Sequence, residues 1–353
     1  MLPGKSATSD ATLHHALVLL ETPPAQITPQ MAAQAARNHY GLEGDIVALS
    51  GERDRNFLLR PARGEALVLK FSNPAEDEAT TAFQIALLQH IEREGPRLPA
   101  PRVRLTCNGT GLTSVTDALG TSVALHAISL LPGVPAQGLP SSERLRRNIG
   151  HALGQTALAL ASFRHPGAGR VLLWDIMQAP SLRVVLACVQ DPARRRFIAA
   201  FLDRFEHDLL PWLRNLPRQV IHNDLSASNI MLASAQDPTV VGVLDFGDAV
   251  HAPRINDLAV AASYHLGDST APLDAIAGMV AAYEGLVPIQ AQERTALPDL
   301  ILARLVIRTI INEWRSARFP DNRAYIQRNM RQAWALLDRF IAMPGNDNPK
   351  APS

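Results

Sequence analysis

The feature that most constrains the fold is a change in hydrophobic pattern along the chain. Short β-prone runs at residues 46–49, 56–60 and 66–71 are separated by Gly51 and by the turn-forming stretch 61–64. Long amphipathic stretches with a helical period dominate after residue 132. Strands first and helices afterwards predict an α+β fold, with an antiparallel meander near the N-terminus.

Other elements fit the same division. Thr28 and Pro29 are suited to begin a helix that runs to about residue 40. A second helix is expected at about 76–94, ended by Gly95 and Pro96. The remaining expected elements are strands near 103–107 and 123–131, helices at 142–164, 194–214 and 297 to the mid-340s, and short strands at 220–221, 230–232 and 240–244.

The segment 131–135, Leu-Pro-Gly-Val-Pro, breaks the pattern between the two halves. We therefore expect two lobes: an N-terminal sheet lobe with a helix over residues 1–131, and a helical lobe over residues 132–353.

Composition excludes several classes of protein. With 34 Lys and Arg against 33 Asp and Glu, the net charge of +1 gives no basic field for nucleic acid and no support for membrane binding. The two cysteines, Cys107 and Cys188, lack metal-ligand spacing and suit a reducing compartment. The apolar run 16–20 is too short for a signal peptide or a membrane span. We expect a soluble, cytoplasmic protein.

The strand island in the helical half carries the chemistry. Asp224 follows His222 and Asn223, Asn229 comes five residues later, and Asp245 follows the next apolar run in the order Asp-Phe-Gly-Asp. Phosphoryl transfer needs a carboxylate to orient the attacking hydroxyl and oxygen ligands to hold Mg²⁺ on the phosphates. Surface turns use the same residue types, but the ordered set between apolar strands favours the functional interpretation.

Two further features suit a bound nucleotide. Lys70 ends the apolar strand Ala-Leu-Val-Leu-Lys, where a lysine that holds the α- and β-phosphates is expected. Ser50 and Gly51 lie at the turn expected to cover the phosphates, although a simple hairpin turn would have the same sequence.

With these residues the chain resembles the aminoglycoside phosphotransferase and choline kinase superfamily, which has a protein-kinase-like fold. Within it the resemblance is greatest to the hydroxylysine kinase group, whose members include domains fused to class III aminotransferases. The similar segments span nearly the whole chain: the loop 49–59, Phe83-Gln84 with Leu87, His165-Pro166 with Leu173-Trp174-Asp175, Asp245 to Asp248 with Asp257, Ala303-Arg304-Leu305, and Pro320-Asp321-Asn322.

The resemblance implies roles for individual residues. Asp224 would be the catalytic base or hydroxyl-orienting group, Asn229 and Asp245 the Mg²⁺ ligands, and Lys70 the phosphate-holding residue. The segment from Ser129 to Leu131 would present backbone groups to the purine of ATP or GTP. Asp257 would support the catalytic loop.

The chain departs from the group at two places. Residues 225–228 are Leu-Ser-Ala-Ser, where relatives usually have an Asn-Asp pair. Asn223 replaces the glycine of the usual His-Gly-Asp, which is the choline and ethanolamine kinase form. Both changes leave the chemistry in place but weaken an inference about the acceptor.

The partner of Lys70 is expected to be Gln84, the position that matches the helix glutamate of protein kinases; Glu78 is better placed to favour the helix dipole. His222 is expected to bond to backbone and support the loop rather than act as a base.

The expected acceptor is a small amino alcohol or hydroxy amino acid, similar to ethanolamine or hydroxylysine. A cationic amine calls for carboxylates or aromatic faces, with little positive charge nearby. The candidates are Asp248, Glu313, Trp174 and Asp175, although Asp248 could cap a turn, Trp174 could be core, and Glu313, expected to be buried, could form a structural salt bridge.

Alternatives remain open. The chain could be an aminoglycoside, choline or homoserine kinase, or a pseudokinase that binds nucleotide as a regulatory module. Intact Lys70, Asp224, Asn229 and Asp245 argue against a pseudokinase. The sequence does not fix the acceptor, the choice of ATP or GTP, or the oligomeric state.

Overall fold

The computed structural model describes residues 17–19, 21–51, 53–266, 272–320, 326 and 330–342. These residues form two compact units. The first, called the sheet unit, takes the described parts of 1–136 together with 162–169 and 229–247. The second, called the helical unit, takes 137–161, 170–228 and the described parts of 248–353. The lobe boundary after Leu131 stays a prediction.

One antiparallel sheet forms the centre of the sheet unit. Strand β2 pairs with β1 and β3, and β3 pairs with β6, so the predicted meander is confirmed. Strand β5 also pairs with β6 and was not predicted. The strand order is β1 (Gly44–Leu49), β2 (Arg55–Pro61), β3 (Leu67–Phe71), β6 (Ser122–Ser129) and β4 (Val103–Arg104), with β5 (Thr113–Thr116) beside β6.

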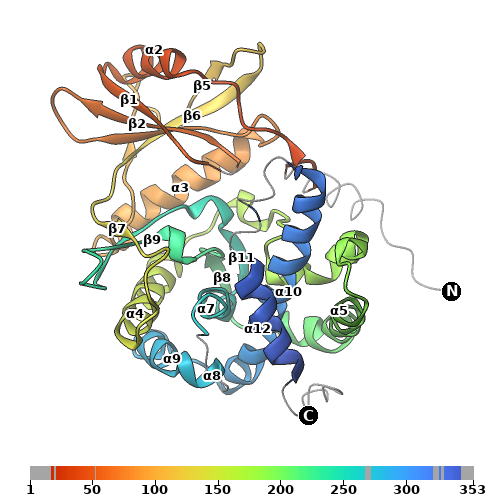
Figure 1. The fold of residues 1–353 in the computed structure, drawn as a ribbon. Coiled ribbons are helices and arrows are strands. Elements are labelled where there is room, and N and C mark those ends of the chain that lie inside the picture. The colour runs from red at the N-terminus through yellow and green to blue at the C-terminus, as the bar shows by residue number, and fades with distance from the viewer. Residues whose placement is uncertain are drawn as a thin grey trace. The chain divides into compact units, whose positions relative to one another are not determined.

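Two helices accompany this sheet, and both were predicted. Helix α2 (Pro29–Tyr40) begins where Thr28 accepts a hydrogen bond from the Met31 N–H, and it buries its alanines against the sheet. Helix α3 (Glu78–Glu94) begins at Asp77, which accepts a hydrogen bond from the Thr80 N–H. Figure 1 shows α2 on one side of the sheet and α3 on the other.

Two later segments complete the sheet unit. In residues 162–169, the rings of Phe163 and His165 lie 5.9 Å and 5.5 Å from the ring of Phe83 on α3. A small sheet has the strand order β10-β9-β7. It is linked to the segment between α3 and β4 by a hydrogen bond of 2.8 Å from the Val243 N–H to Pro99 O. Its strands are β7 (Val134–Pro135), β9 (Ile230–Leu232) and β10 (Val240–Val243).

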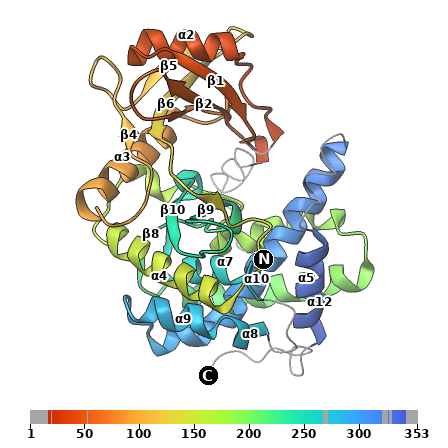
Figure 2. The ribbon, with the colours of Figure 1, turned by 60° about the vertical axis from the view of Figure 1, so that its left-hand side comes forward.

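The helical unit is built around α10 (Ala291–Arg318), which packs against α7 (Ile255–Ala262) and α12 (Met330–Ala342). Figures 1 and 2 show these helices side by side. Helix α4 (Glu143–Leu160) crosses α9 (Ala277–Glu284) closely at Gly150, where a Cβ would lie 2.1 Å from Met279 O. Only glycine fits such a crossing.

The predicted helix at 194–214 consists of α5 (Pro192–Arg204), a π turn at Phe205–Leu209 and α6 (Leu210–Leu213). The stretch predicted from 297 to the mid-340s is two helices, α10 and α12. Asp321 and Asn322, which carry part of the family resemblance, lie outside the described residues. A 3₁₀ segment at Ile176–Cys188, with Pro180 inside it, was not predicted.

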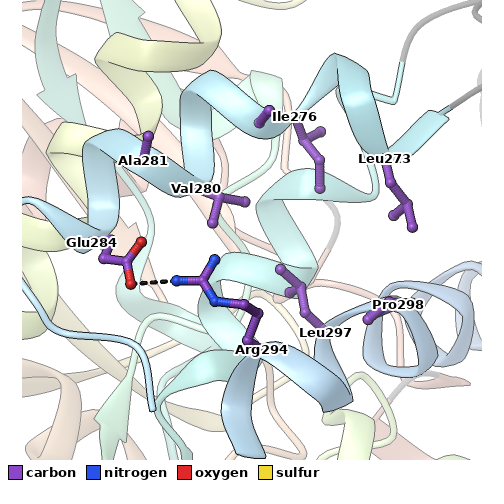
Figure 3. Close-up of a pocket in the computed structure, with 9 residues that line it drawn as sticks. Leu273, Ile276, Val280, Ala281, Glu284, Arg294, Leu297 and Pro298 are labelled. Atoms are coloured by element: carbon purple, nitrogen blue, oxygen red, sulfur yellow. Dashed lines mark hydrogen bonds and ion pairs between the residues drawn. The ribbon is translucent and has the colours of Figure 1, made fainter. Parts of the chain in front are cut away.

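A hollow of about 260 Å³ lies where α8 (Pro272–Ala275) and α9 face the first turns of α10. Its wall is mostly apolar, with an ion pair between Arg294 and Glu284 at one side (Figure 3). None of the residues singled out from the sequence lines it, so we assign it no part in the chemistry. In the described part of the chain, no helix combines the length and apolarity needed to cross a membrane.

Candidate active site

Lys70 is held by two carboxylates. Its Nζ lies 3.6 Å from Asp54 Oδ2 and 3.6 Å from Asp245 Oδ1, and only 12% of its side chain is exposed. Burial lowers the pKa of Lys70, but Asp245 and Asp54 outweigh burial and raise that pKa above its ordinary value. Lys70 is therefore a fixed positive charge at the end of β3.

Gln84 is not the partner of Lys70, so that expectation was wrong. Gln84 is buried on α3, and within the described chain the ion-pair partners of Lys70 are Asp54 and Asp245. Strand register could have found Asp54. Asn56 lies opposite Lys70 across β2 and β3, and Asp54 is two positions before Asn56, where a strand presents the same face.

His126 is a second neighbour of Lys70 that the sequence did not suggest. It lies opposite Lys70 across β3 and β6 and is 2% exposed. Burial, followed by the charge of Lys70, lowers the pKa of His126 to about 3, so the ring is neutral at pH 7. Its Nδ1 is buried without a hydrogen-bond partner in the described part of the chain. The neutral imidazole therefore adds no charge beside Lys70.

The turn between β1 and β2 needs glycine at Gly51. A Cβ there would lie 2.4 Å from Asp54 O and 2.9 Å from Asn56 Nδ2. Ser50 beside it is exposed. Asp54, whose carbonyl makes this close approach, also pairs with Lys70 through its carboxylate.

The residues expected to face a purine follow β6. The Ser129 N–H donates to Arg102 O, and the Ser129 hydroxyl accepts from the Arg102 N–H, both at 2.9 Å. The Leu131 N–H makes no hydrogen bond to a backbone carbonyl within the described chain. Of Ser129 and Leu131, it is therefore Leu131 whose backbone N–H could bond to a ligand.

Asn229 and Asp245 lie at the open end of one hairpin. Strands β9 and β10 pair up to Ile230 and Val243, and the Leu244 N–H then donates to Asn229 O at 2.8 Å. Asp245 has φ of 55°, an uncommon value for a residue other than glycine, and half of its side chain is exposed. The hairpin brings together two of the predicted metal ligands.

This pair of ligands fits magnesium. A carboxylate and an amide oxygen are hard ligands, and Mg²⁺ usually takes one or two of them together with phosphates and water. Among the described residues, no three His, Cys, Asp or Glu side chains gather closely enough to hold a metal ion by themselves. The donor set suits a metal that arrives with a nucleotide.

Asp257 holds the loop that begins at His222 and carries Asp224, in the helical unit. Its carboxylate accepts hydrogen bonds from the backbone N–H groups of His222 at 2.9 Å and Asn223 at 2.6 Å. Burial raises the pKa of Asp257, against the lowering effect of His222 and these two bonds. The His222 Nδ1 accepts from the Asp224 N–H at 3.2 Å. The supporting roles expected for Asp257 and His222 are confirmed.

Asn223 explains one departure from the family pattern. The loop follows β8 (Arg218–Ile221), which pairs with β11 (Val250–Pro253), and Asn223 has φ of 65°. Glycine adopts a positive φ without strain, and asparagine tolerates it better than most residues. The exchange of Gly for Asn at this position therefore preserves a backbone conformation.

Asp224 has a cation beside it, so the expectation of little positive charge is wrong at this point. Arg304 Nη2 lies 3.0 Å from Asp224 Oδ1. Trp174 does face a cation, but that cation is the Arg304 guanidinium, 5.3 Å from the ring centroid. Arg304 and Arg308 are both buried on α10.

The other acceptor candidates have separate surroundings. Asp248 is buried in a 3₁₀ turn and interacts electrostatically with Arg304. Asp175 is buried and caps the 3₁₀ segment by accepting from the Met177 N–H. Glu313 was expected to be buried and is only half-buried; it accepts a hydrogen bond from Trp334 Nε1 at 3.1 Å. Asp248 and Asp175 both interact electrostatically with Arg304, the partner of Asp224.

Solved structures share this fold. An amicoumacin kinase in complex with AMP-PNP and Ca²⁺ superimposes with a TM-score of 0.67 at 14% identity, covering 87% of this chain and 94% of that chain. A microcompartment-associated aminopropanol kinase gives 0.64 at 15%, covering 89% and 97%. This chain therefore has the fold of these two kinases.

The particular family follows from the sequence. The model of the phosphotransferase enzyme family matches residues 45–297, and the chain belongs to this family. Hydroxylysine kinase of Mus musculus is 23% identical over 339 residues, 90% of each chain. Homoserine kinase of Methylocella silvestris is 29% identical over 272 residues, 74% of this chain and 78% of that one. The resemblance to hydroxylysine kinases is confirmed.

Proposed function

We propose that this phosphotransferase is a magnesium-dependent kinase that transfers the γ-phosphate of ATP or GTP to a hydroxyl group of a small amino alcohol or hydroxy amino acid. One observation carries the proposal. Lys70, the residue proposed to hold the phosphates, is ion-paired at 3.6 Å with Asp245, which lies with Asn229 at the open end of one hairpin. A cation for the phosphates and oxygen ligands for a metal thus lie within the same unit.

The nucleotide would be held from several sides. Lys70 would bind the α- and β-phosphates, and the turn at Ser50 and Gly51 would cover them. Ser129 and Leu131 would present backbone groups to the purine. Asn229 and Asp245 would hold Mg²⁺, which when bound neutralises charge on the phosphate oxygens.

Asp224 would act on the acceptor. A carboxylate at this point in the loop accepts a hydrogen bond from the attacking hydroxyl and turns its oxygen toward the γ-phosphorus. The hydroxyl proton passes to Asp224 as the new phosphate ester bond forms and the bond to the nucleoside diphosphate breaks. The bonds that Asp257 makes to the loop keep Asp224 in a constant backbone position.

The acceptor class rests on relatives and on nearby carboxylates. The hydroxylysine kinases and a homoserine kinase among the relatives make hydroxy amino acids the leading acceptors. Asp248 is the best-placed candidate to bind a substrate ammonium, and Trp174 is the candidate to contact the apolar part of the substrate. Glu313 and Asp175 are weaker candidates because each already accepts a hydrogen bond from another residue of the chain. Homoserine phosphorylation is the second candidate function. Aminoglycoside and choline acceptors remain as further alternatives.

The test is a transfer assay with purified protein. ATP or GTP, Mg²⁺ and a panel of hydroxy amino acids, amino alcohols, choline and aminoglycosides would be incubated, and phosphorylated product measured by mass spectrometry. We expect product only with Mg²⁺, and none from Asp245→Asn. Nucleotide binding without transfer to any acceptor would instead indicate a pseudokinase.

We further propose a cytoplasmic enzyme, with no nucleic-acid partner.

A further inference from the structure

Arg304 is a buried cation in contact with the loop carboxylate that the proposed mechanism uses. It lies on α10, 80 positions after Asp224 in sequence, and is 1% exposed. Its Nη2 donates to Asp224 Oδ1 at 3.0 Å, and its Nη1 donates to Trp174 O. The guanidinium also lies over the Trp174 ring. The two hydrogen bonds and the contact with the ring together restrict the movement of the guanidinium.

The ion pair is asymmetric in exposure. The Asp224 side chain is 26% exposed, whereas that of Arg304 is 1% exposed. Burial lowers the pKa of Arg304, but Tyr264, Asp224 and Asp248 outweigh it and raise that pKa, so Arg304 stays charged. The Asp224 carboxylate is thus partly accessible to a ligand, whereas the described part of the chain covers Arg304 almost entirely.

We propose that Arg304 is a positioning residue for phosphoryl transfer: it fixes Oδ1 of Asp224 and so sets the direction from which that carboxylate meets the acceptor hydroxyl. The inference rests on the proposed function, because it assumes that Asp224 orients the acceptor. An aspartate has two side-chain torsions, and an ion pair from a rigid, planar donor group removes that freedom. Misplacement by about 1 Å costs on the order of 100-fold in rate.

A purely structural role is the alternative, and Arg308 provides the matched control. It lies one turn after Arg304 on the same helix and is 5% exposed. Its Nη1 donates to Ser263 O at 3.2 Å, and its guanidinium lies 3.9 Å from the Tyr264 ring centroid. Loss of either arginine removes a buried, bonded cation. Of the two, Arg304 donates a hydrogen bond to Asp224, whereas Arg308 interacts with Asp224 through charge alone.

The experiment compares Arg304→Met, Arg304→Lys and Arg308→Met for kcat, for KM of nucleotide and acceptor, and for melting temperature. We expect Arg304→Met to lower kcat about 100-fold with nucleotide KM changed less than about threefold. Arg304→Lys should recover part of kcat, because it keeps the charge without the planar fork. Arg308→Met should change kcat less than about threefold at a similar loss of melting temperature.

The double variant Asp224→Asn with Arg304→Met gives the decisive readout. If Arg304 acts through Asp224, its loss should lower kcat no further once Asp224 is changed. Additive losses, or an equal fall in kcat for Arg308→Met, would overturn the positioning role. If Arg304→Met does not fold, the same cycle with Arg304→Lys decides.

The outcomes also separate this inference from the proposed function. If Asp224→Asn lowers kcat and neither Arg304 variant does, only the positioning role fails. If Asp224→Asn keeps wild-type turnover, or the wild type phosphorylates no acceptor, the proposed function fails and the positioning role fails with it.

Discussion

Replacing Asn223 by glycine and by alanine tests whether the catalytic loop depends on its left-handed backbone. Both substitutions remove the amide, whose two polar atoms are buried without partners in the described part of the chain. The two variants therefore differ mainly in the free energy that residue 223 needs to adopt a φ of 65°. Alanine costs roughly 1–2 kcal/mol there, and glycine costs roughly 0.5–1 kcal/mol through the entropy of the unfolded chain.

The difference predicts that Asn223→Ala is less stable than Asn223→Gly by about 1 kcal/mol, or about 1–2 °C in melting temperature for a chain of this length. Asn223→Gly should stay within about 1 kcal/mol of the wild type, because removing an unpaired buried amide offsets the entropy. It should also keep kcat, since the similar group usually has glycine at this position.

Asn256 supplies the control. Its amide is also fully buried without partners in the described chain, but it lies in helix α7. There alanine should be more stable than glycine by about 1 kcal/mol, which reverses the order at Asn223. Thermal unfolding of the four variants measures both differences. An Asn223→Ala protein as stable as Asn223→Gly would refute the backbone argument.

Three further predictions address the site and its surroundings. Asp224→Asn should lower turnover by several orders of magnitude while titration calorimetry shows unchanged nucleotide binding, because this group acts on the acceptor. Asp245→Asn should abolish magnesium-dependent nucleotide binding; a binding isotherm with unaltered dependence on Mg²⁺ would remove Asp245 from the metal site. Burial raises the pKa of Asp175 to about 6, so the folded state binds its proton more tightly than the unfolded chain, and stability falls as pH rises from about 4 to about 6. Asp175→Asn can still accept from the Met177 N–H, and we expect it to be more stable than the wild type by up to about 3 kcal/mol at pH 7.5, with no difference at pH 4. A stability difference independent of pH would contradict this reasoning.

Sequence reasoning reached the residues whose roles depend on local spacing. Asn229 and Asp245 lie together at the open end of one hairpin, and Lys70 lies near the end of a strand, so local chain geometry sets their positions. The support from Asp257 came from resemblance, and the two hydrogen bonds to the loop confirm it. The spacing of residues along a hairpin or a short loop predicts their positions because the backbone has few alternative geometries there.

Contacts between segments that are far apart in the sequence could not be predicted from the sequence. The bond between Arg304 and Asp224 depends on where α10 packs, which no periodicity gives. Glu313 was expected to be buried, but helical phase does not show which side chains a neighbouring helix brings near. Glu313 is half-buried and accepts a hydrogen bond from Trp334 of α12. The 3₁₀ segment at 176–188 was missed because it lacks the period of an α-helix.

The sheet unit is assembled from three separate stretches of chain, and this has a consequence for how the protein is made. Both proposed metal ligands belong to the last stretch, residues 229–247, whereas Lys70 belongs to the first. On the ribosome, the strands around Lys70 emerge long before Asn229 and Asp245 are synthesised. The unit is therefore incomplete until about two thirds of the chain has been translated, and a fragment ending at residue 136 would carry the phosphate-holding lysine without either metal ligand. Nascent chains would thus contain an N-terminal sheet well before they contain a place for Mg²⁺ on a nucleotide.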